Sequence, residues 1–169
     1  NSQAQNDGII TAIELKQDLD QLKKILESNH PQLFRFTSRE QFDSLYAEAE
    51  KEFFDNMDIK DAFLPFSRII ASIGCGHTRI DLPKRYWENH SSGIFPAELL
   101  ISGSKVLIKS SFAENNSLPV GAEIVSINEI SIEEIVKDFR QYSSGDGFWN
   151  SRRDWLASKY FAPRLAAMF

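Results

Sequence analysis

The residues best suited to chemistry in this 169-residue chain follow one another in a single short motif. It combines a thiol, an imidazole, a hydroxyl and a guanidinium, and two glycines relax the steric limits on its backbone. The motif consists of Gly74, Cys75, Gly76, His77, Thr78 and Arg79. Cys75 and His77 could form a catalytic thiol–imidazole pair, but a free cysteine is more commonly a small core residue. We therefore interpret the motif as a rigid junction between two parts of the fold.

Other reactive combinations are sparse. The chain has no G-x-S-x-G sequence, and its one S-x-x-K spacing joins Ser102 to Lys105 across a predicted hairpin turn, where nothing would desolvate the lysine. The glycine-rich stretch Ser143–Gly147 offers too few oxygen ligands for calcium, and its composition predicts a flexible linker. Cys75 is the only cysteine, and no Cys/His spacing marks a zinc site. We predict no catalytic residue, no metal site and no cofactor in this chain.

Composition excludes two further classes of function. The formal net charge is −5, and no run of Lys or Arg forms a basic patch, so the chain is not expected to bind nucleic acid. No apolar run approaches the roughly 20 residues that span a bilayer, so no membrane span is expected. Hydrophobic residues make up 42% of the chain, enough to bury a core.

Both ends suggest a processed and longer protein. The polar start, Asn1 to Asn6, is typical of a mature N-terminus after signal-peptide removal, which predicts a secreted or periplasmic protein. The apolar end, Leu165 to Phe169, lacks the polar tail of an ordinary terminus, so we expect further chain beyond it.

The first half of the chain is expected to be helical. Thr11 with Glu14, and Ser38 with Gln41, have the spacing of capping boxes, and an apolar stripe at steps of three and four follows each pair. Asp58 can cap a third helix that ends at Gly74. This third helix contains Pro65, Phe66, Ile70 and Ile73, and the proline predicts a kink or a fresh start.

Beyond Gly76 the pattern changes to strands. Thr78–Leu82 has the composition of an extended segment, and Ala97–Ile101 and Lys105–Lys109 are predicted to form a hairpin. Glu123–Ile127 is a predicted third strand, and a short amphipathic helix follows from Ser131. A last helix is expected after Ser151, with solvated arginines on its outer face. These arginines are Arg152, Arg153 and Arg164.

The order of these motifs resembles a known family. The chain contains I-G-C-G-H-T-R, then S-G-I-F, then L-P-V-G-A-E-I-V-S-I-N, followed by a helix. This order is similar to that of the non-catalytic N-terminal half of the C-terminal processing peptidases, the tricorn-like serine peptidase family. In that family a PDZ domain precedes the catalytic domain. Where Cys75 stands, many members have Asp, so its carboxylate is missing here. Where Glu129 follows Asn128, the family has Gly, which suits a turn with two positive φ angles.

The resemblance also implies a peptide site. Backbone N–H groups of a loop would hold a peptide C-terminus, and the peptide would add as a strand beside Phe95 to Leu99, facing the following helix. The residues implied are Ser92, Gly93, Ile94, Phe95, Ile132 and Val136. Pro96 removes one backbone donor from that edge.

Together these expectations describe an α+β chain. Residues 1–12 form a polar tail, 13–76 a three-helix bundle, 77–142 a PDZ-like β domain, and 143–169 a linker and helix. The expected function is to position or admit polypeptide for a serine peptidase domain further along the same chain. The alternatives are a stand-alone module that binds peptide or protein termini, and a PDZ-like region that serves only as packing.

Overall fold

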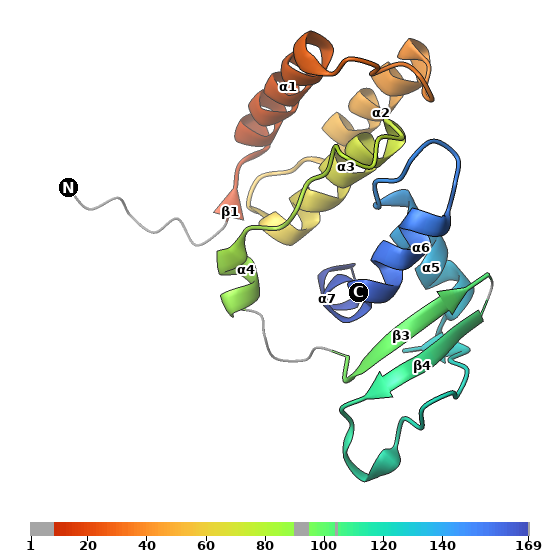
Figure 1. Ribbon diagram of the computed structural model, residues 1–169. Coiled ribbons are helices and arrows are strands. Elements are labelled where there is room, and N and C mark those ends of the chain that lie inside the picture. Colours follow the sequence, from red (N-terminus) through yellow and green to blue (C-terminus); the bar gives the residue numbers. More distant parts are fainter. Residues whose placement is uncertain (1–8, 90–94, 104, 169) are drawn as a thin grey trace.

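Figure 1 shows a computed structural model of the chain, which describes residues 9–89, 95–103 and 105–168. The fold is mixed α and β, and within these residues seven α-helices accompany small two-stranded antiparallel sheets. In chain order the elements are β1 (Ile9–Ile10), α1 (Ala12–Asn29), α2 (Arg39–Glu52), β2 (Met57–Asp58), α3 (Ile59–Ser72), α4 (Lys84–Asn89), β3 (Ala97–Ser102), β4 (Lys105–Ser111), the 3-10 turn η1 (Glu114–Asn116), β5 (Ser126–Ile127), β6 (Ile130–Ser131), α5 (Ile132–Gln141), α6 (Ser151–Lys159) and α7 (Phe161–Met168).

The first two helices begin at the predicted capping boxes. The Thr11 hydroxyl accepts the Glu14 N–H at 3.2 Å, and the Glu14 carboxylate accepts the Thr11 N–H at 2.9 Å. Ser38 and Gln41 exchange the same pair of bonds at 3.2 and 3.0 Å. Each reciprocal pair satisfies backbone donors that a helix start otherwise leaves unpaired. The starts of α1 and α2 are therefore confirmed.

The third helix, α3, begins as predicted and makes no fresh start at Pro65. Asp58 caps it as expected, since its Oδ1 accepts the Lys60 N–H at 2.7 Å. The helix nevertheless continues through Pro65 without a fresh start, and the proline ring is fully buried. Burial of that ring in the core offsets the loss of one helical hydrogen bond. Gly74 then leaves the helix with φ +68°, the left-handed conformation expected of a C-terminal glycine.

The side chains of α1, α2 and α3 share one apolar core. Its most completely buried members are Leu15, Phe42, Ala49, Ile69 and Ile73. The aromatic residues contribute directly, since the ring of Phe42 lies edge-on to that of Phe34 with centroids 5.6 Å apart. This geometry is the favoured one for aromatic pairs.

The predicted hairpin forms as β3 and β4, with Ser102 opposite Lys105 across the turn. The predicted third strand is divided between two partners. Ile124 donates its N–H to the Val106 carbonyl at 2.8 Å, so the stretch up to Ile124 lies along the free edge of β4. Residues Ser126–Ile127 instead form β5, which pairs with β6. Thr78–Leu82, predicted to be extended, belongs to no assigned strand.

The predicted C-terminal helix is interrupted. It forms α6 and α7, with a break at Tyr160. A continuous helix would require the N–H of residue 163 to bond the carbonyl of Lys159, and Pro163 has no N–H. In the first turn of a new helix that donor has no partner in any case, so Pro163 is tolerated there.

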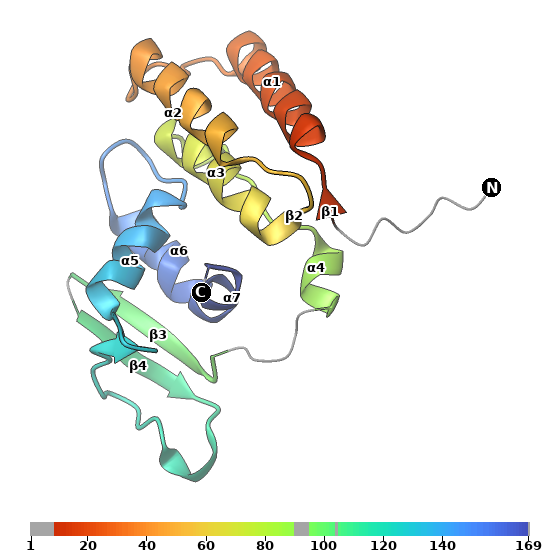
Figure 2. The same cartoon turned by 180° about the vertical axis from the view of Figure 1, so that it is seen from behind.

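A second apolar core joins the hairpin to α5, α6 and α7. It includes Leu99, Val106, Ile135, Phe139 and Phe161, each no more than 1% exposed. Figures 1 and 2 show α1–α3 together at one side of the molecule, the hairpin at the opposite side, and α5–α7 between them. Within the described residues, no helix is both long enough and apolar enough to cross a membrane.

Candidate functional site

The sequence-predicted peptide site is only partly described by the structure. Ser92, Gly93 and Ile94 lie outside the described residues. Ile132 and Val136 lie on α5, and each is only 5% exposed because it packs in the second core. A peptide could reach these two side chains only if the segments that cover them moved.

The covering segments are the chain's own C-terminal helices. Helix α6 packs against β3, and the Ser158 hydroxyl accepts the Ile101 N–H at 2.9 Å on the edge of β3 that faces away from β4. Ala157 is fully buried in the same core, and the Phe161 ring lies edge-on to Phe95 at 5.8 Å. The groove expected between β3 and α5 is therefore filled by α6 and α7 in this conformation.

The junction motif is held by backbone and side-chain hydrogen bonds from the loop that precedes α6. The Gly76 N–H donates to Asp146 Oδ1 at 2.9 Å, and the Gly147 N–H donates to the Gly74 carbonyl at 2.9 Å. The Ser144 hydroxyl donates to the Thr78 carbonyl at 2.6 Å. Ser143–Gly147, expected as a flexible linker, is thus a packed loop, because its polar groups find partners on the junction.

Two of the three arginines expected on a solvated helix face take part in packing. Arg153 is half-buried and donates to the carbonyls of Ser143 and Gly147. Arg164 is half-buried and donates to the Ser143 hydroxyl. Arg152 has an exposed side chain but still donates to the Gly76 carbonyl at 3.0 Å.

A side chain at Gly76 would require the side chains of Asp146 and Arg152 to move. A Cβ there would lie 2.7 Å from Asp146 Oδ1 and 2.8 Å from Arg152 Nε. A larger residue at this position would therefore disturb the hydrogen bond between the Gly76 N–H and Asp146.

Cys75 and His77 do not form a side-chain pair. Burial raises the pKa of the Cys75 thiol, but hydrogen bonds from the Thr78 hydroxyl and from the backbone N–H groups of His77 and Thr78 outweigh it, so the net pKa shift is downward. The imidazole of His77 is exposed. The motif therefore favours the thiolate of Cys75 through the Thr78 hydroxyl and two backbone N–H groups.

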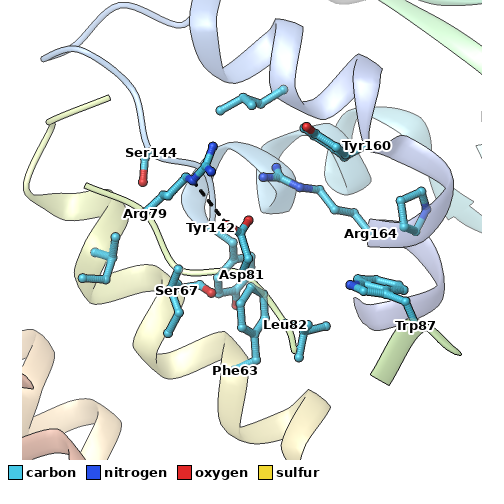
Figure 3. A pocket seen from close by; sticks show the side chains of 14 residues that line it. Phe63, Ser67, Arg79, Asp81, Leu82, Trp87, Tyr142, Ser144, Tyr160 and Arg164 are labelled. Atoms are coloured by element: carbon cyan, nitrogen blue, oxygen red, sulfur yellow. Dashed lines mark ion pairs between the residues drawn. The ribbon is translucent and has the colours of Figure 1, made fainter. Parts of the chain in front are cut away.

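A cavity of about 410 Å³ lies between α3, the segment after the junction, α4 and the last two helices (Figure 3). Large apolar pockets with a few converging polar groups are the usual form of a ligand site. The apolar walls are formed by Phe63, Ile70, Leu82, Trp87, Leu156 and Pro163. The cavity lies next to the junction motif, whose last residue, Arg79, also lines it.

The polar groups of this cavity come from several elements. Arg79 and Asp81 form an ion pair at 3.3 Å, and both side chains are more than 70% exposed. Arg164 extends from α7 toward the side where these two residues lie (Figure 3). Burial lowers the pKa of Arg164, and the negative charge of Asp81 acts in the opposite direction.

Ser67 is the most deeply buried polar residue of the wall. It is 1% exposed, and its hydroxyl has no hydrogen-bond partner among the described residues. A buried hydroxyl without a partner is costly, so such groups in natural proteins call for an explanation. Sequence reasoning missed Ser67 because a serine within an apolar helical stripe has no distinctive spacing.

Arg164 was also missed as a site residue. Its spacing places it on a helix, but only the packing of α7 against α3 turns it toward the cavity.

No three described His, Cys, Asp or Glu side chains converge as a metal site would require. A comparison with models of known protein families finds no match to this chain, and neither does a comparison with curated proteins.

Proposed function

We propose that this chain is the non-catalytic region of an exported serine peptidase and that it positions polypeptide for a peptidase domain of the same protein. The proposal follows the motif order described above, and one structural observation supports it. The hairpin strand β3 pairs with β4 on one side only, and its other edge faces a helix instead of a strand. Such an edge can bind an extended peptide through its backbone groups.

Among the residues that the structure describes, one polar contact, between Ser158 and Ile101, attaches helix α6 to this edge. The Ser158–Ile101 bond is a side-chain substitute for a strand hydrogen bond, and the remaining α6 contacts to β3 are packing contacts. A peptide that displaced α6 could form hydrogen bonds with the backbone of β3 and pack against the apolar side chains of α5. Peptide binding at this site would therefore require α6 to move.

Exposed aromatic residues near the junction also favour a partner domain. Phe148 and Trp149 are 82% and 77% exposed, and they belong to the loop that holds the junction motif. Neighbouring large apolar side chains on a surface commonly mark a contact with another domain. The proposal assigns that contact to the peptidase domain.

The test measures where a peptide binds and whether α6 opposes it. Extended apolar peptides added to the chain should shift the NMR signals of the outward-facing β3 amides, above all Ile101. Ser158→Ala should raise the affinity about 2- to 10-fold, because one hydrogen bond that competes with the peptide is lost. Ser151→Ala, an exposed change on the same helix, is the matched control and should leave the affinity unchanged.

Two results would contradict the proposal. Peptides that bind without shifting any β3 amide would remove the proposed site. Cleavage of peptide bonds by the purified 169-residue chain would show that it is not a non-catalytic region.

A further inference from the structure

A groove of about 450 Å³ lies between α3 and the helices α5 and α6, at the side of the molecule where α5 is next to α3 (Figure 2). It shares no described lining residue with the cavity beside the junction. No described carboxylate lines it, and its charged lining residues are all cations: Arg68, Lys137, Arg140 and Arg153. The whole chain has a formal net charge of −5, so this positive charge is a local feature of the groove.

Two of these arginines have donors that their ion pairs leave unused. Arg140 donates Nε to Asp154 at 2.6 Å and Nη2 to the Gly103 carbonyl at 3.2 Å, and its Nη1 bonds no described residue. Arg68 donates Nη2 to Glu52, while its buried Nε has no hydrogen-bond partner in the described part of the chain. A buried donor of this kind calls for an explanation.

The other two cations form no ion pair among the described residues. Arg153 uses Nε and Nη1 for backbone carbonyls, and its Nη2 is unbonded within the same residues. Lys137 is exposed on α5. Carboxylates outside the groove offset part of its charge, since Glu48 acts on Arg68 and Asp146 acts on Arg153 in addition to the two ion pairs. The cations that line the groove nevertheless keep free donors on three different helices.

The start of α6 adds backbone donors to the same groove. Asn150 is the N-cap of this helix and lines the groove, but its side chain forms no capping hydrogen bond. The first N–H groups of a helix have no partner within the helix, and the helix dipole places partial positive charge there. A helix start beside several cations is a favourable place for an oxyanion.

The lining of the groove narrows the class of anion. A phosphate group carries up to two negative charges and several acceptor oxygens, so it can use more of these donors than a single carboxylate can. The apolar lining residues are Leu45 and Ala71, and no described aromatic side chain is present on which a nucleotide base could stack. Recognition would therefore depend on the phosphate groups and not on a base.

We propose that this groove binds a soluble molecule that carries a diphosphate. Arg140 and Arg153 donate hydrogen bonds to its oxygens, Lys137 supplies a further positive charge, and the start of α6 contributes backbone N–H groups. The site is separate from the edge of β3, so this inference does not depend on the proposed peptide binding.

The experiment is a calorimetric titration of the chain with inorganic pyrophosphate, and with sulfate for comparison, at low ionic strength. Pyrophosphate should bind at least about 10-fold more tightly than sulfate, because it presents more charge and more acceptor oxygens to the groove. Lys137→Gln should weaken the binding of pyrophosphate about 3- to 10-fold, and Lys137→Arg, which keeps the charge, should retain it. Lys84→Gln makes the same charge change at a side chain on α4 that is 91% exposed, so it is the matched control and should leave the affinity unchanged.

Three results of the titrations would overturn the inference: no binding of pyrophosphate, equal binding of pyrophosphate and sulfate, or an equal loss of affinity in Lys137→Gln and Lys84→Gln. Sedimentation with phosphatidylglycerol vesicles distinguishes a soluble phosphate from a lipid headgroup. The chain should stay in solution, and retention on the vesicles that pyrophosphate does not reverse would also overturn the inference. None of these measurements involves the β3 amides, so the proposed function stands or falls separately.

Discussion

At the scale of single residues, Cys75 lies where hydrogen-bond donors lower the pKa of its thiol. If the proposed relationship to the peptidases holds, Asp would commonly occupy this position, and its carboxylate could accept the hydrogen bonds that the thiol accepts from Thr78 and from the His77 N–H. Backbone donors aimed at one side chain favour its anionic form. The donors around Cys75 therefore favour its thiolate, against the effect of burial.

This environment predicts the pH dependence of Cys75 alkylation. Because the hydrogen bonds outweigh burial and lower the pKa of Cys75, the thiolate should form at a lower pH in the folded chain than in the unfolded chain. The thiolate contributes stability that is present above the unfolded pKa and lost as the pH falls through the folded pKa. Iodoacetamide labelling followed by mass spectrometry should give a lower midpoint pH in the folded chain than in urea. Equal midpoints would contradict this account.

At the scale of elements, the β5–β6 hairpin has the strained turn that its sequence predicts. Asn128 and Glu129 have φ angles of 50° and 68°, so both central residues are left-handed. A two-residue turn of this hand suits the twist of paired strands, but it favours glycine at the second position. Glu129 therefore bears a local cost that the rest of the fold tolerates.

Glu129→Gly should stabilise the chain by about 1 kcal/mol, because glycine adopts the left-handed conformation without the clash of a Cβ. Urea unfolding followed by circular dichroism measures the change. Glu129→Ala removes the same charge but keeps the Cβ, so it is the matched control. If the glycine variant is no more stable than the alanine variant, the turn is not strained as described.

At the scale of the whole molecule, the loop before α6 connects the junction to the second core. Asp146 accepts the N–H of the buried Gly76 across 70 residues of chain. Ser144 and Gly147 add further bonds to Thr78 and Gly74. These contacts join the region of α1–α3 to that of α5–α7, with the cavity beside them.

Asp146→Ala should lower the free energy of unfolding by about 1–3 kcal/mol, because it leaves a buried backbone donor without its acceptor. It should also speed hydrogen exchange at Gly76. Asp20→Ala, an exposed change on α1, is the control and should alter the free energy of unfolding by less than about 0.5 kcal/mol. If both variants change the free energy of unfolding by a similarly small amount, the loop before α6 does not stabilise the fold through Asp146.

The sequence by itself determined the local features of this protein. Residues only a few positions apart set these features. They are the capping boxes at Thr11 and Ser38, the N-cap at Asp58, the helix C-terminus at Gly74 and the hairpin of β3 and β4. Short-range hydrogen bonds and side-chain periodicity decide such features, so pattern reasoning can find them.

Only the tertiary structure decided where distant segments meet. Contacts between residues tens of positions apart decide how the loop 143–147 packs on the junction and where α6 lies on β3. They also turn Arg164 toward the cavity. Loop composition predicts that a segment has many polar groups, but it does not reveal which distant groups will form hydrogen bonds with them. The cavity arises because α3 packs against α7, so no local sequence pattern indicates that it exists.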